Sequence, residues 1–371
     1  MTSKRTVYVE ATPLVRKNRT GVDYYALGLF SELIAKMPEV EFRLFYFSDE
    51  FHNLEIKAKN IKKIPIEKIS SRNFRLRHML GIAPTLEQLL DEKHIELVLF
   101  TNFYAWPVAT KNAKVFQFVY DTTYIDTPEY VAKRNRILLR RLVGKTITRA
   151  TKVITISEAA KKALIGHYGG KDDDYVVIYP APKLSRSTQK VEKMPDSFLL
   201  FMGTLEPRKN VANLIKAHLS LDDRIREQYP LVLAGGKGWN DEEILGLIED
   251  NIGNQIYAIG YVNDAQKAWL YKNAYALVYP ALFEGFGMPI VEAMAVGAPV
   301  VTCDNTSLPE AGGDAALYCD TTVEGIAQGM LACIDDKVRK RRILEGKSWA
   351  RKFSWQQSAK KLKDIIEGAQ D

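Results

Sequence analysis

A glycine-rich turn between a predicted strand and a predicted helix carries the residue types best suited to ligand chemistry. Glu284 opens the turn, Gly285 and Gly287 follow it, and Glu292 falls within the first turn of a helix predicted to begin at Pro289. The glycines let the backbone approach a ligand closely, and the amides of a helix N-terminus attract phosphate oxygens. Both carboxylates can accept hydrogen bonds from a vicinal diol, such as that of a sugar or a ribose. The alternative is that Glu292 only complements the helix dipole and Glu284 only faces solvent.

Two adjacent cations, Arg208 and Lys209, follow a second glycine, Gly203, at the end of another predicted strand. They precede a helix predicted to begin near Asn210, and cations at a helix N-terminus oppose its dipole, so an anion should compensate them. A diphosphate fits this position, because Arg offers a planar fork to two oxygens and Lys offers a compact charge. The alternative is a solvated pair of cations balanced by Glu206.

Two weaker candidates lie in the first half of the chain. Asp121 ends a strand predicted over 115–120, where parallel α/β sheets often hold functional groups, although the residue type also fits a simple helix N-cap. Gly21 begins a helix predicted over 21–36, and the segment 17–23 could form a loop over the same phosphates. A glycine before a helix can also be an ordinary turn.

The first half of the chain is basic. Residues 1–190 hold 32 Lys and Arg against 20 Asp and Glu, whereas the remainder holds 20 against 25, which suggests an anionic partner for the first half. The segment 131–152 has eight basic residues and no acidic ones, and a basic amphipathic helix can rest on anionic lipid headgroups. No zinc finger or RNP motif accompanies the charge, so we expect no nucleic-acid partner. In the alternative to membrane contact, the domain core covers the apolar stripe of Ile137, Leu138, Leu142 and Val143.

Several classes of protein are disfavoured by what the sequence lacks. The five histidines are scattered without HExxH or similar spacing, and the run 172–174 of three aspartates is more typical of a polar turn than of a cation site. We therefore expect no metal and no cofactor. Three cysteines without a CxxC pair favour a reducing compartment. No signal-peptide core follows Met1 and no run approaches the roughly 18 apolar residues of a spanning helix, so we expect a cytoplasmic protein, soluble or peripheral at the inner membrane face.

Short strands must alternate with longer helices to position these residues, and the chain supplies that alternation twice. With 371 residues, 46% hydrophobic and 26% charged, it fits a globular protein of two domains. A Pro- and Ser-rich linker is predicted at 179–190. The pattern predicts an α/β fold of two doubly wound, Rossmann-like units with a central cleft between them. Strands are predicted over 6–10, 42–47, 97–101, 115–120, 152–156 and 175–179, and then over 197–203, 230–235, 255–260, 276–279, 299–302 and 316–318.

These motifs resemble those of the retaining glycosyltransferases of family 4, which have the GT-B fold. The stretch 284–292 resembles their E-x7-E signature, and 203–210 resembles their phosphate-binding Arg/Lys segment. Gly21, 155–158 and 307–310 extend the resemblance over nearly the whole chain. The resemblance implies three parts: a Rossmann-like acceptor-binding domain over 1–185, a Rossmann-like nucleotide-sugar-binding domain over 186–352, and a C-terminal helix over 353–371 that can pack back on the first domain.

Carried over by position, the resemblance implies a role for each candidate. Arg208 and Lys209 would hold the donor diphosphate, Glu284 would contact the transferred sugar, and Asp121 would complete the catalytic set. Many members have His where this chain has Tyr120, a departure that bears on the choice of sugar. The donor-binding residues would be Gly203, Gly285, Phe286, Gly287 and Met288 along the sugar and phosphates, Glu292 on the ribose diol, Gly21 closing over the phosphates, and Tyr261 or Val262 near the base.

The resemblance also implies an activity. It is a hexose transfer, with retention, from a nucleotide-diphosphate sugar to a glycan or lipid-linked acceptor in polysaccharide or lipopolysaccharide biosynthesis. Because no cluster of metal ligands is visible in the sequence, we expect this transfer to be metal-independent. The sequence of 279–290 is similar to that of bacterial surface-polysaccharide mannosyltransferases. This similarity favours GDP-mannose as the donor, with a UDP-sugar as the other option. The alternatives are a non-catalytic partner subunit that binds glycan or nucleotide, and a sugar-nucleotide epimerase or phosphorylase on the same architecture.

Overall fold

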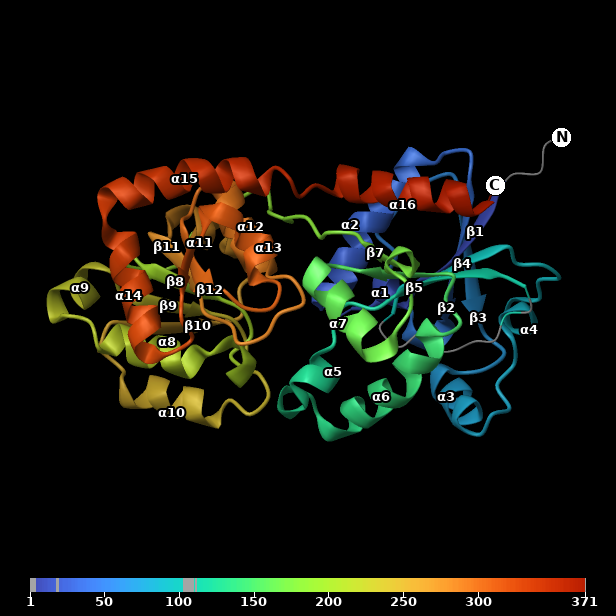
Figure 1. Ribbon diagram of the computed structural model, residues 1–371, viewed down its shortest axis with the longest axis horizontal. Helices are drawn as coiled ribbons and strands as arrows, with labels where there is room; N and C mark the ends of the chain where they lie inside the picture. The colour runs from blue at the N-terminus through green and yellow to red at the C-terminus, as the bar shows by residue number, and fades with distance from the viewer. Residues whose placement is uncertain (1–4, 18–19, 103–109, 111, 371) are drawn as a thin grey trace. The chain divides into compact units, whose positions relative to one another are not determined.

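The computed structural model describes residues 5–17, 20–102, 110 and 112–370, and it consists of two compact units (Figure 1). The first unit contains Met1–Ala181 together with Ser354–Asp371, and the second contains Pro182–Phe353. Residues 18 and 19, which belong to the loop predicted over 17–23, lie outside the described residues.

The first unit is built on a parallel sheet of seven strands in the order β3-β2-β1-β4-β5-β6-β7. The central strands β1 and β4 are adjacent although two strands separate them in the chain, which is the reversal point of a doubly wound sheet. Four of the five residues of β1 and all four of β4 are buried, because helices cover both faces of a parallel sheet. The strands are β1 (Thr6–Glu10), β2 (Glu41–Phe47), β3 (Ile61–Ile66), β4 (Leu97–Phe100), β5 (Lys114–Phe118), β6 (Lys152–Thr155) and β7 (Tyr175–Val177).

The strand β3 (Ile61–Ile66) is not among the strands predicted from the sequence. This strand contains Pro65 and two exposed lysines, Lys62 and Lys63, and among the described strands it pairs with β2 alone, at the border of the sheet. A proline cannot donate a hydrogen bond to a neighbouring strand, and lysine is typical of strands that border solvent. The proline and the lysines that disfavoured a strand prediction are therefore residues that suit an edge strand.

The C-terminal helix belongs to the first unit, where it packs on α2. Gly28 makes this approach possible: a Cβ atom at that position would lie 2.4 Å from the Trp355 ring. Ala359, Leu362 and Ile366 join the core of the first unit from the same helix. The helices of this unit are α1 (Thr12–Val15), α2 (Gly21–Lys36), α3 (Ser71–Met79), α4 (Leu86–Leu90), α5 (Thr123–Asp126), α6 (Lys133–Ile147), α7 (Glu158–Tyr168) and α16 (Trp355–Gln370), with 3-10 turns η1 (Ser48–Glu50), η2 (Pro128–Tyr130) and η3 (Asp172–Asp174).

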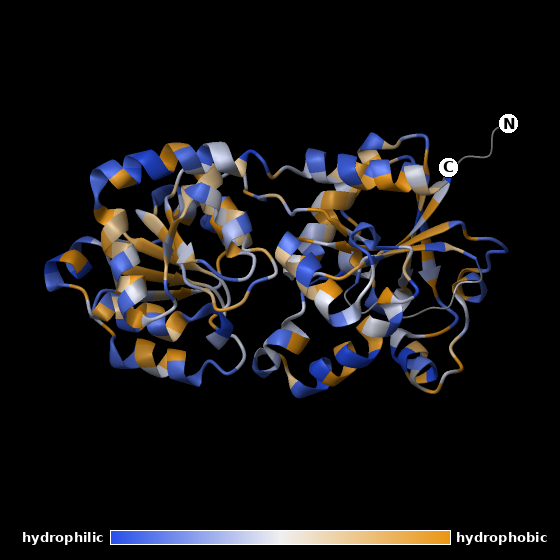
Figure 2. Ribbon diagram, in the orientation of Figure 1, coloured by the Kyte–Doolittle hydropathy of each residue, from blue (hydrophilic) through white to orange (hydrophobic). Residues whose placement is uncertain are grey.

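The second unit has a parallel sheet of six strands in the order β10-β9-β8-β11-β12-β13. Its first and fourth strands, β8 and β11, are neighbours at the centre, so this sheet also reverses direction between them. Figure 2 shows hydrophobic strands inside each unit and hydrophilic outer faces on the helices. The strands are β8 (Leu199–Met202), β9 (Leu231–Ala234), β10 (Ile256–Gly260), β11 (Ala276–Tyr279), β12 (Val300–Cys303) and β13 (Leu317–Cys319).

The helices of the second unit follow its strands in alternation. The predicted linker over 179–190 contains no helix or strand. The helices are α8 (Val211–Leu219), α9 (Asp223–Gln228), α10 (Glu242–Asp250), α11 (Asp264–Asn273), α12 (Met288–Val296), α13 (Leu308–Gly312), α14 (Val323–Ile334) and α15 (Asp336–Ala350), with 3-10 turns η4 (Pro207–Lys209) and η5 (Gly313–Ala315).

Candidate functional site

The carboxyl ends of β8 and β11 bring the predicted cations and one predicted carboxylate together. These two strands are parallel neighbours at the reversal point of the second sheet, the place where open α/β sheets bind ligands. Arg208 and Lys209 lie on η4, which follows β8, and Glu284 lies in the turn that follows β11. The pairing of β8 with β11, whose partner residues Leu199 and Ala276 are 77 positions apart in sequence, therefore creates the cluster.

Lys209, Glu284 and Tyr279 form a closed set of hydrogen bonds. The ammonium group of Lys209 makes an ion pair with Oε1 of Glu284 and also donates to the Tyr279 hydroxyl at 2.7 Å. The same hydroxyl donates to Oε1 of Glu284 at 2.5 Å. Lys209 is only 8% exposed and Tyr279 only 1%, so each depends on the others for its polar partners.

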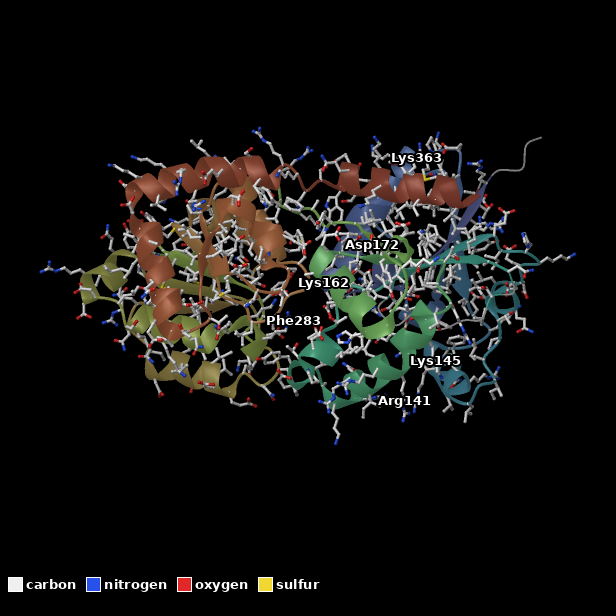
Figure 3. All side chains as sticks on the ribbon, in the orientation of Figure 1. Arg141, Lys145, Lys162, Asp172, Phe283 and Lys363 are labelled. Carbon is white, nitrogen blue, oxygen red and sulfur yellow. The ribbon has the colours of Figure 1, made fainter. Side chains whose placement is uncertain are left out.

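Arg208 lies on the other side of the same carboxylate. Its Nη1 donates to Oε2 of Glu284 at 3.2 Å and to the backbone oxygen of Phe283, labelled in Figure 3, at 2.8 Å. Its Nη2 donates to Oε1 of Glu206 at 2.6 Å. Because Glu284 and Glu206 balance the two cations within the protein, the anion predicted to compensate them is supplied by side chains, one of them the Glu206 of the alternative interpretation. That interpretation also held the two cations to be solvated, but only 20% of the Arg208 side chain and 10% of the Lys209 side chain are exposed.

The charges in this cluster shift its pKa values in opposing ways. Burial alone would raise the pKa of Glu284, but the charges of Lys209 and Arg208 outweigh burial and lower it from 4.5 to about 2. Burial lowers the pKa of Lys209, and the Glu284 charge offsets only part of that change. Burial, with the Glu284 charge, raises the pKa of the Tyr279 hydroxyl, which therefore keeps its proton and can donate it in a hydrogen bond.

Glu292 lies on the buried side of α12, and its hydrogen-bond partners differ from those of Glu284. The helix begins at Met288, one residue earlier than predicted, so Glu292 occupies its second turn and the predicted first-turn position is wrong. Its Oε1 accepts a hydrogen bond from Nζ of Lys267 at 2.8 Å, and its Oε2 accepts one from the Tyr271 hydroxyl at 3.0 Å. Glu292 is only 6% exposed. The Glu284 side chain is only 11% exposed, so the alternative in which Glu284 only faces solvent is wrong.

The glycine-rich turn itself is held from the next segment of chain. The amide of Glu284 donates to Thr306 Oγ1 at 3.3 Å, and Ser307 Oγ donates to the Glu284 carbonyl at 2.8 Å. Gly287 precedes α12 with a φ of 102°, a left-handed conformation that favours glycine, and no side chain caps the helix there. The turn thus ends at the helix N-terminus, in the arrangement that favours anions.

The remaining residues predicted in the second half occupy separate places. Gly203 follows β8, and its backbone oxygen would lie 1.8 Å from a Cβ atom at Gly235, so this pair serves close packing of two loops. Phe286 is buried, with its ring 5.3 Å from that of Phe353. Tyr261, 80% exposed, and the half-buried Val262 follow the edge strand β10, two strands from β8.

Gly21 and Asp121 belong to the first unit. Gly21 is the first residue of α2, after Thr20, which shares a capping box with Asp23. Oδ1 of Asp121 accepts hydrogen bonds from the backbone amide and the hydroxyl of Thr123 at the start of α5. The N-cap residue of this helix is Thr122, so Asp121 lies one position before the N-cap and not at it, as the alternative had predicted. Tyr120 is buried, and its hydroxyl donates to the Thr101 backbone oxygen at 2.6 Å.

The apolar stripe predicted on the basic segment 131–152 does not face outward. Within α6, Leu142 and Val143 are buried, and Val143 belongs to the core cluster that also holds Leu139 and Ile147. Only Ile137 is well exposed among the stripe residues, at 45%. The core therefore takes the apolar side of α6, as the alternative interpretation holds, and leaves its cations toward solvent.

Sequence reasoning missed three side chains of the site. Tyr279 was predicted as the last residue of a strand and as part of the stretch 279–290, but not as a site residue, and Lys267 and Tyr271 on α11 were not predicted at all. A signal was available for the last two, because they are four residues apart and so share one face of a helix. Among the described residues, no three His, Cys, Asp or Glu side chains gather as a metal site would require. In the same part of the chain, no helix is long and apolar enough to cross a membrane.

Comparison with known families accounts for nearly all of the chain. Residues 20–186 match the family described as Glycosyltransferase Family 4, and residues 185–349 match that described as Glycosyl transferases group 1. O-antigen chain mannosyltransferase B of Escherichia coli is 29% identical over 371 residues, which cover 93% of this chain and 95% of the relative. An O-antigen chain mannosyltransferase of Salmonella typhimurium is 28% identical over 201 residues, 54% of this chain and 55% of that protein.

Solved structures of the same fold include several enzymes at low identity. Sucrose-phosphate synthase from Thermosynechococcus elongatus matches with a TM-score of 0.74 at 16% identity, over 98% of both chains. WaaG, a glycosyltransferase involved in lipopolysaccharide biosynthesis, matches with a TM-score of 0.69 at 17% identity, over 98% of this chain and 100% of its own. The predicted fold, two Rossmann-like domains of the GT-B type, is confirmed.

Proposed function

Because this chain belongs to the glycosyltransferases that join a family 4 domain to a group 1 domain, we propose that it transfers a hexose, with mannose favoured, from a nucleotide-diphosphate sugar to a glycan or lipid-linked acceptor. The observation that carries the proposal is the cluster of Arg208, Lys209 and Glu284 at the reversal point of the second sheet. A cationic pair and a carboxylate at such a point suit a diphosphate joined to a sugar.

The donor would exchange partners with the protein in this cluster. Its diphosphate would take the place of the Glu284 carboxylate beside Lys209 and Arg208, and the negative charge would raise the pKa of Lys209 again. Glu284, released from part of its ion pairing, would then accept hydrogen bonds from hydroxyls of the transferred sugar. Glu292 would receive the ribose diol while Lys267 and Tyr271 keep its carboxylate in place.

Catalysis in this proposal rests on the departing diphosphate. Arg208 and Lys209 would stabilise the charge that develops on it, an interaction that strengthens toward the transition state. The acceptor would attack on the face that the nucleotide leaves, which retains the configuration at the anomeric carbon. Since two cations of the protein already serve the leaving group, the proposed transfer needs no metal ion.

The choice of mannose and of polysaccharide biosynthesis rests on the relatives. Two proteins named O-antigen chain mannosyltransferases match this chain, one of them over nearly its full length. GDP-mannose is therefore the favoured donor. A solved structure of the same fold, an Anabaena protein in complex with UDP and glucose, keeps a UDP-sugar as the second option. We also propose a cytoplasmic enzyme that touches the inner membrane face through the cations of 131–152.

Calorimetric titration of the full chain with GDP-mannose, UDP-glucose and the free nucleotides tests the donor. Binding of GDP-mannose to the wild type, lost in Lys209→Ala and kept in Lys216→Ala, is the expected result. Lys216 is a suitable control because its ion pair with Glu243 is exposed. No binding of any nucleotide sugar would remove the transferase assignment in favour of a non-catalytic subunit. Products formed without acceptor would instead indicate an epimerase, and anomeric NMR of the transferred sugar tests retention.

A further inference from the structure

The first unit has an outward apolar cluster that its core does not use. Leu76 is 52% exposed, and Leu80 and Ile82 are each 65% exposed. In the described part of the first unit, no other large apolar side chain is as exposed as these three. Single exposed leucines are ordinary, but three large apolar side chains this exposed within seven residues are a candidate interaction site.

Local structure brings the three side chains together. Leu76 and Leu80 are four residues apart, so they share one face at the end of α3. The helix ends in a Schellman motif: the amide of Ile82 donates to the Arg77 carbonyl and that of Gly81 to the His78 carbonyl, both at 3.0 Å, with Gly81 at a φ of 73°. This motif turns the chain back so that the residue after the glycine comes beside the last turn of the helix.

The opposite face of α3 is the one that the core covers. Phe74 is fully buried, with its ring 5.3 Å from that of Phe47, and His78 stacks on Phe74 at 6.5 Å. Because Phe74 and His78 hold the helix from the inner side, Leu76 and Leu80 cannot turn inward without unpacking it. Their exposure is thus fixed by the fold.

Arginines alternate with the apolar residues along α3, one of them, Arg75, paired with Glu50, and further cations lie on α6. The segment 71–82 contains three arginines and no acidic residue, and 131–152 contains eight basic residues and none that are acidic. Burial lowers the pKa of His78, and the charges of Lys145 and Arg149 lower it further, which places the end of α6 beside α3. Figure 1 shows both helices on the same side of the first unit, and Figure 3 labels Arg141 and Lys145 on α6.

We propose that Leu76, Leu80 and Ile82 insert into the headgroup region of an anionic lipid bilayer while the exposed cations of α3 and α6 bind its headgroups. Exposed apolar side chains with cations beside them match this occupant, since a bilayer surface offers an apolar layer beneath negative charge. The electrostatic half of this inference rests on the membrane contact proposed for 131–152. The apolar half is new, and it replaces the stripe of α6 that the core covers.

Sedimentation of the full chain with vesicles tests both halves separately. One set of vesicles is phosphatidylcholine and the other an equal mixture of phosphatidylcholine and phosphatidylglycerol, with neither donor nor acceptor present. The wild type should bind the mixed vesicles, less strongly in high salt, and should bind neutral vesicles poorly. Failure to bind the mixed vesicles, or equal binding to both kinds, would overturn the proposal.

Two triple variants separate apolar insertion from charge. Leu76→Gln with Leu80→Gln and Ile82→Gln should weaken partition into mixed vesicles at least about tenfold, because exposed apolar area is lost while helix propensity is kept. Arg134→Gln with Arg141→Gln and Lys145→Gln should weaken it roughly fivefold for each cation removed. If only the second variant weakens binding, apolar insertion is wrong, and the charge contact stands alone.

Matched controls come from the second unit. Ile252→Gln with Leu331→Gln and Leu344→Gln removes three exposed apolar side chains and should leave vesicle binding unchanged. Donor binding by calorimetry should stay at the wild-type level in the first triple variant, so that loss of membrane contact and loss of donor binding remain distinguishable. If that variant instead converts a dimer to a monomer without affecting vesicle binding, the patch joins two copies of the chain and the lipid proposal is wrong.

Discussion

The hydroxyl group of Tyr279 lies 2.5 Å from Oε1 of Glu284 and accepts a hydrogen bond from Nζ of Lys209 at 2.7 Å. Tyr279 is the last residue of a central strand, and its ring stacks on that of Phe201 with centroids 5.9 Å apart. The strand and the stacked ring fix the hydroxyl, and the hydroxyl in turn fixes the two charged groups that the proposed donor would separate. Tyr279 is therefore a positioning residue of the site.

Replacing Tyr279 by phenylalanine should impair transfer more than it impairs folding. The change removes hydrogen bonds to two charged groups, at a cost of about 1.5 to 3 kcal/mol in the free energy of unfolding. It also removes a hydrogen bond that lowers the pKa of Glu284, so the acid limb of the pH–rate profile should move to higher pH. A merely structural role would leave that limb in place.

Tyr275→Phe is the matched control for this variant. In the wild type, the Tyr275 hydroxyl donates a hydrogen bond to the Ile334 carbonyl at 3.1 Å, also within the second unit but outside the cluster. The control variant should lose stability without any shift of the pH profile. A Tyr279→Phe enzyme with the wild-type profile would contradict the positioning role.

The stability of the second unit should depend on Glu284 in acid. Its pKa is lowered from 4.5 in the unfolded chain to about 2 in the fold, so its stabilising contribution is fully present above about pH 5 and is lost as the pH falls toward 2. A shift of this size corresponds to about 3 kcal/mol. Urea unfolding of the wild type between pH 6 and pH 2 should show the loss. Glu284→Gln should be less stable at neutral pH and should depend less on pH, whereas the exposed control Glu249→Gln should follow the wild type.

The ion pair between Lys267 and Glu292 should contribute a measurable interaction free energy to folding. Their atoms are 2.8 Å apart, with 21% and 7% of the two side chains exposed. A double-mutant cycle of Lys267→Met and Glu292→Gln should give about 1 to 2 kcal/mol of interaction in thermal unfolding. The pair Lys216 and Glu243 has the same separation but is far more exposed, so its cycle should give well under 1 kcal/mol. Equal values for the two cycles would show that burial adds nothing to the first.

The strand pattern of both units could be predicted from the sequence, because buried parallel strands are short apolar runs. Two strands, Thr6–Glu10 and Ala276–Tyr279, match their predicted bounds. The strand Ile61–Ile66 could not, since an edge position rewards the lysines and tolerates the proline that a central strand would reject. Strand order also lies beyond a single sequence, yet it is the order that places β8 beside β11.

The residue types of the site could be predicted better than their partners. Glycine, proline and adjacent cations are local signals, and they led to Arg208, Lys209 and Glu284. The role of Tyr279 depends on Lys209, which is 70 residues away in the chain, and no local pattern connects the two. The predicted start of α12 was one residue too late, so Glu292 was assigned to the first helical turn instead of the second. Its contact with Lys267 on α11 joins distant parts of the chain, and no local pattern predicts it.

Activity should persist in EDTA. The proposal gives the charge of the departing diphosphate to Arg208 and Lys209, which leaves no task for a divalent ion. Initial rates of transfer should be equal with EDTA and with added Mg²⁺ or Mn²⁺. Abolished turnover that either ion restores would show that the two cations do not suffice.

Removal of the Arg208 side chain should cost about 2 to 4 kcal/mol in transition-state free energy. Its guanidinium is the planar group that could bind two oxygens of the diphosphate, and in the structure it already binds carboxylate oxygens of Glu206 and Glu284. The measurement is kcat/KM of Arg208→Ala with the true donor. Arg208→Lys keeps the charge without the planar fork, so its kcat/KM should lie between those of the wild type and Arg208→Ala. The exposed control Arg351→Ala should have the kcat/KM of the wild type. Wild-type turnover in Arg208→Ala would refute its role, because the cluster would then hold the fold together without acting on the leaving group.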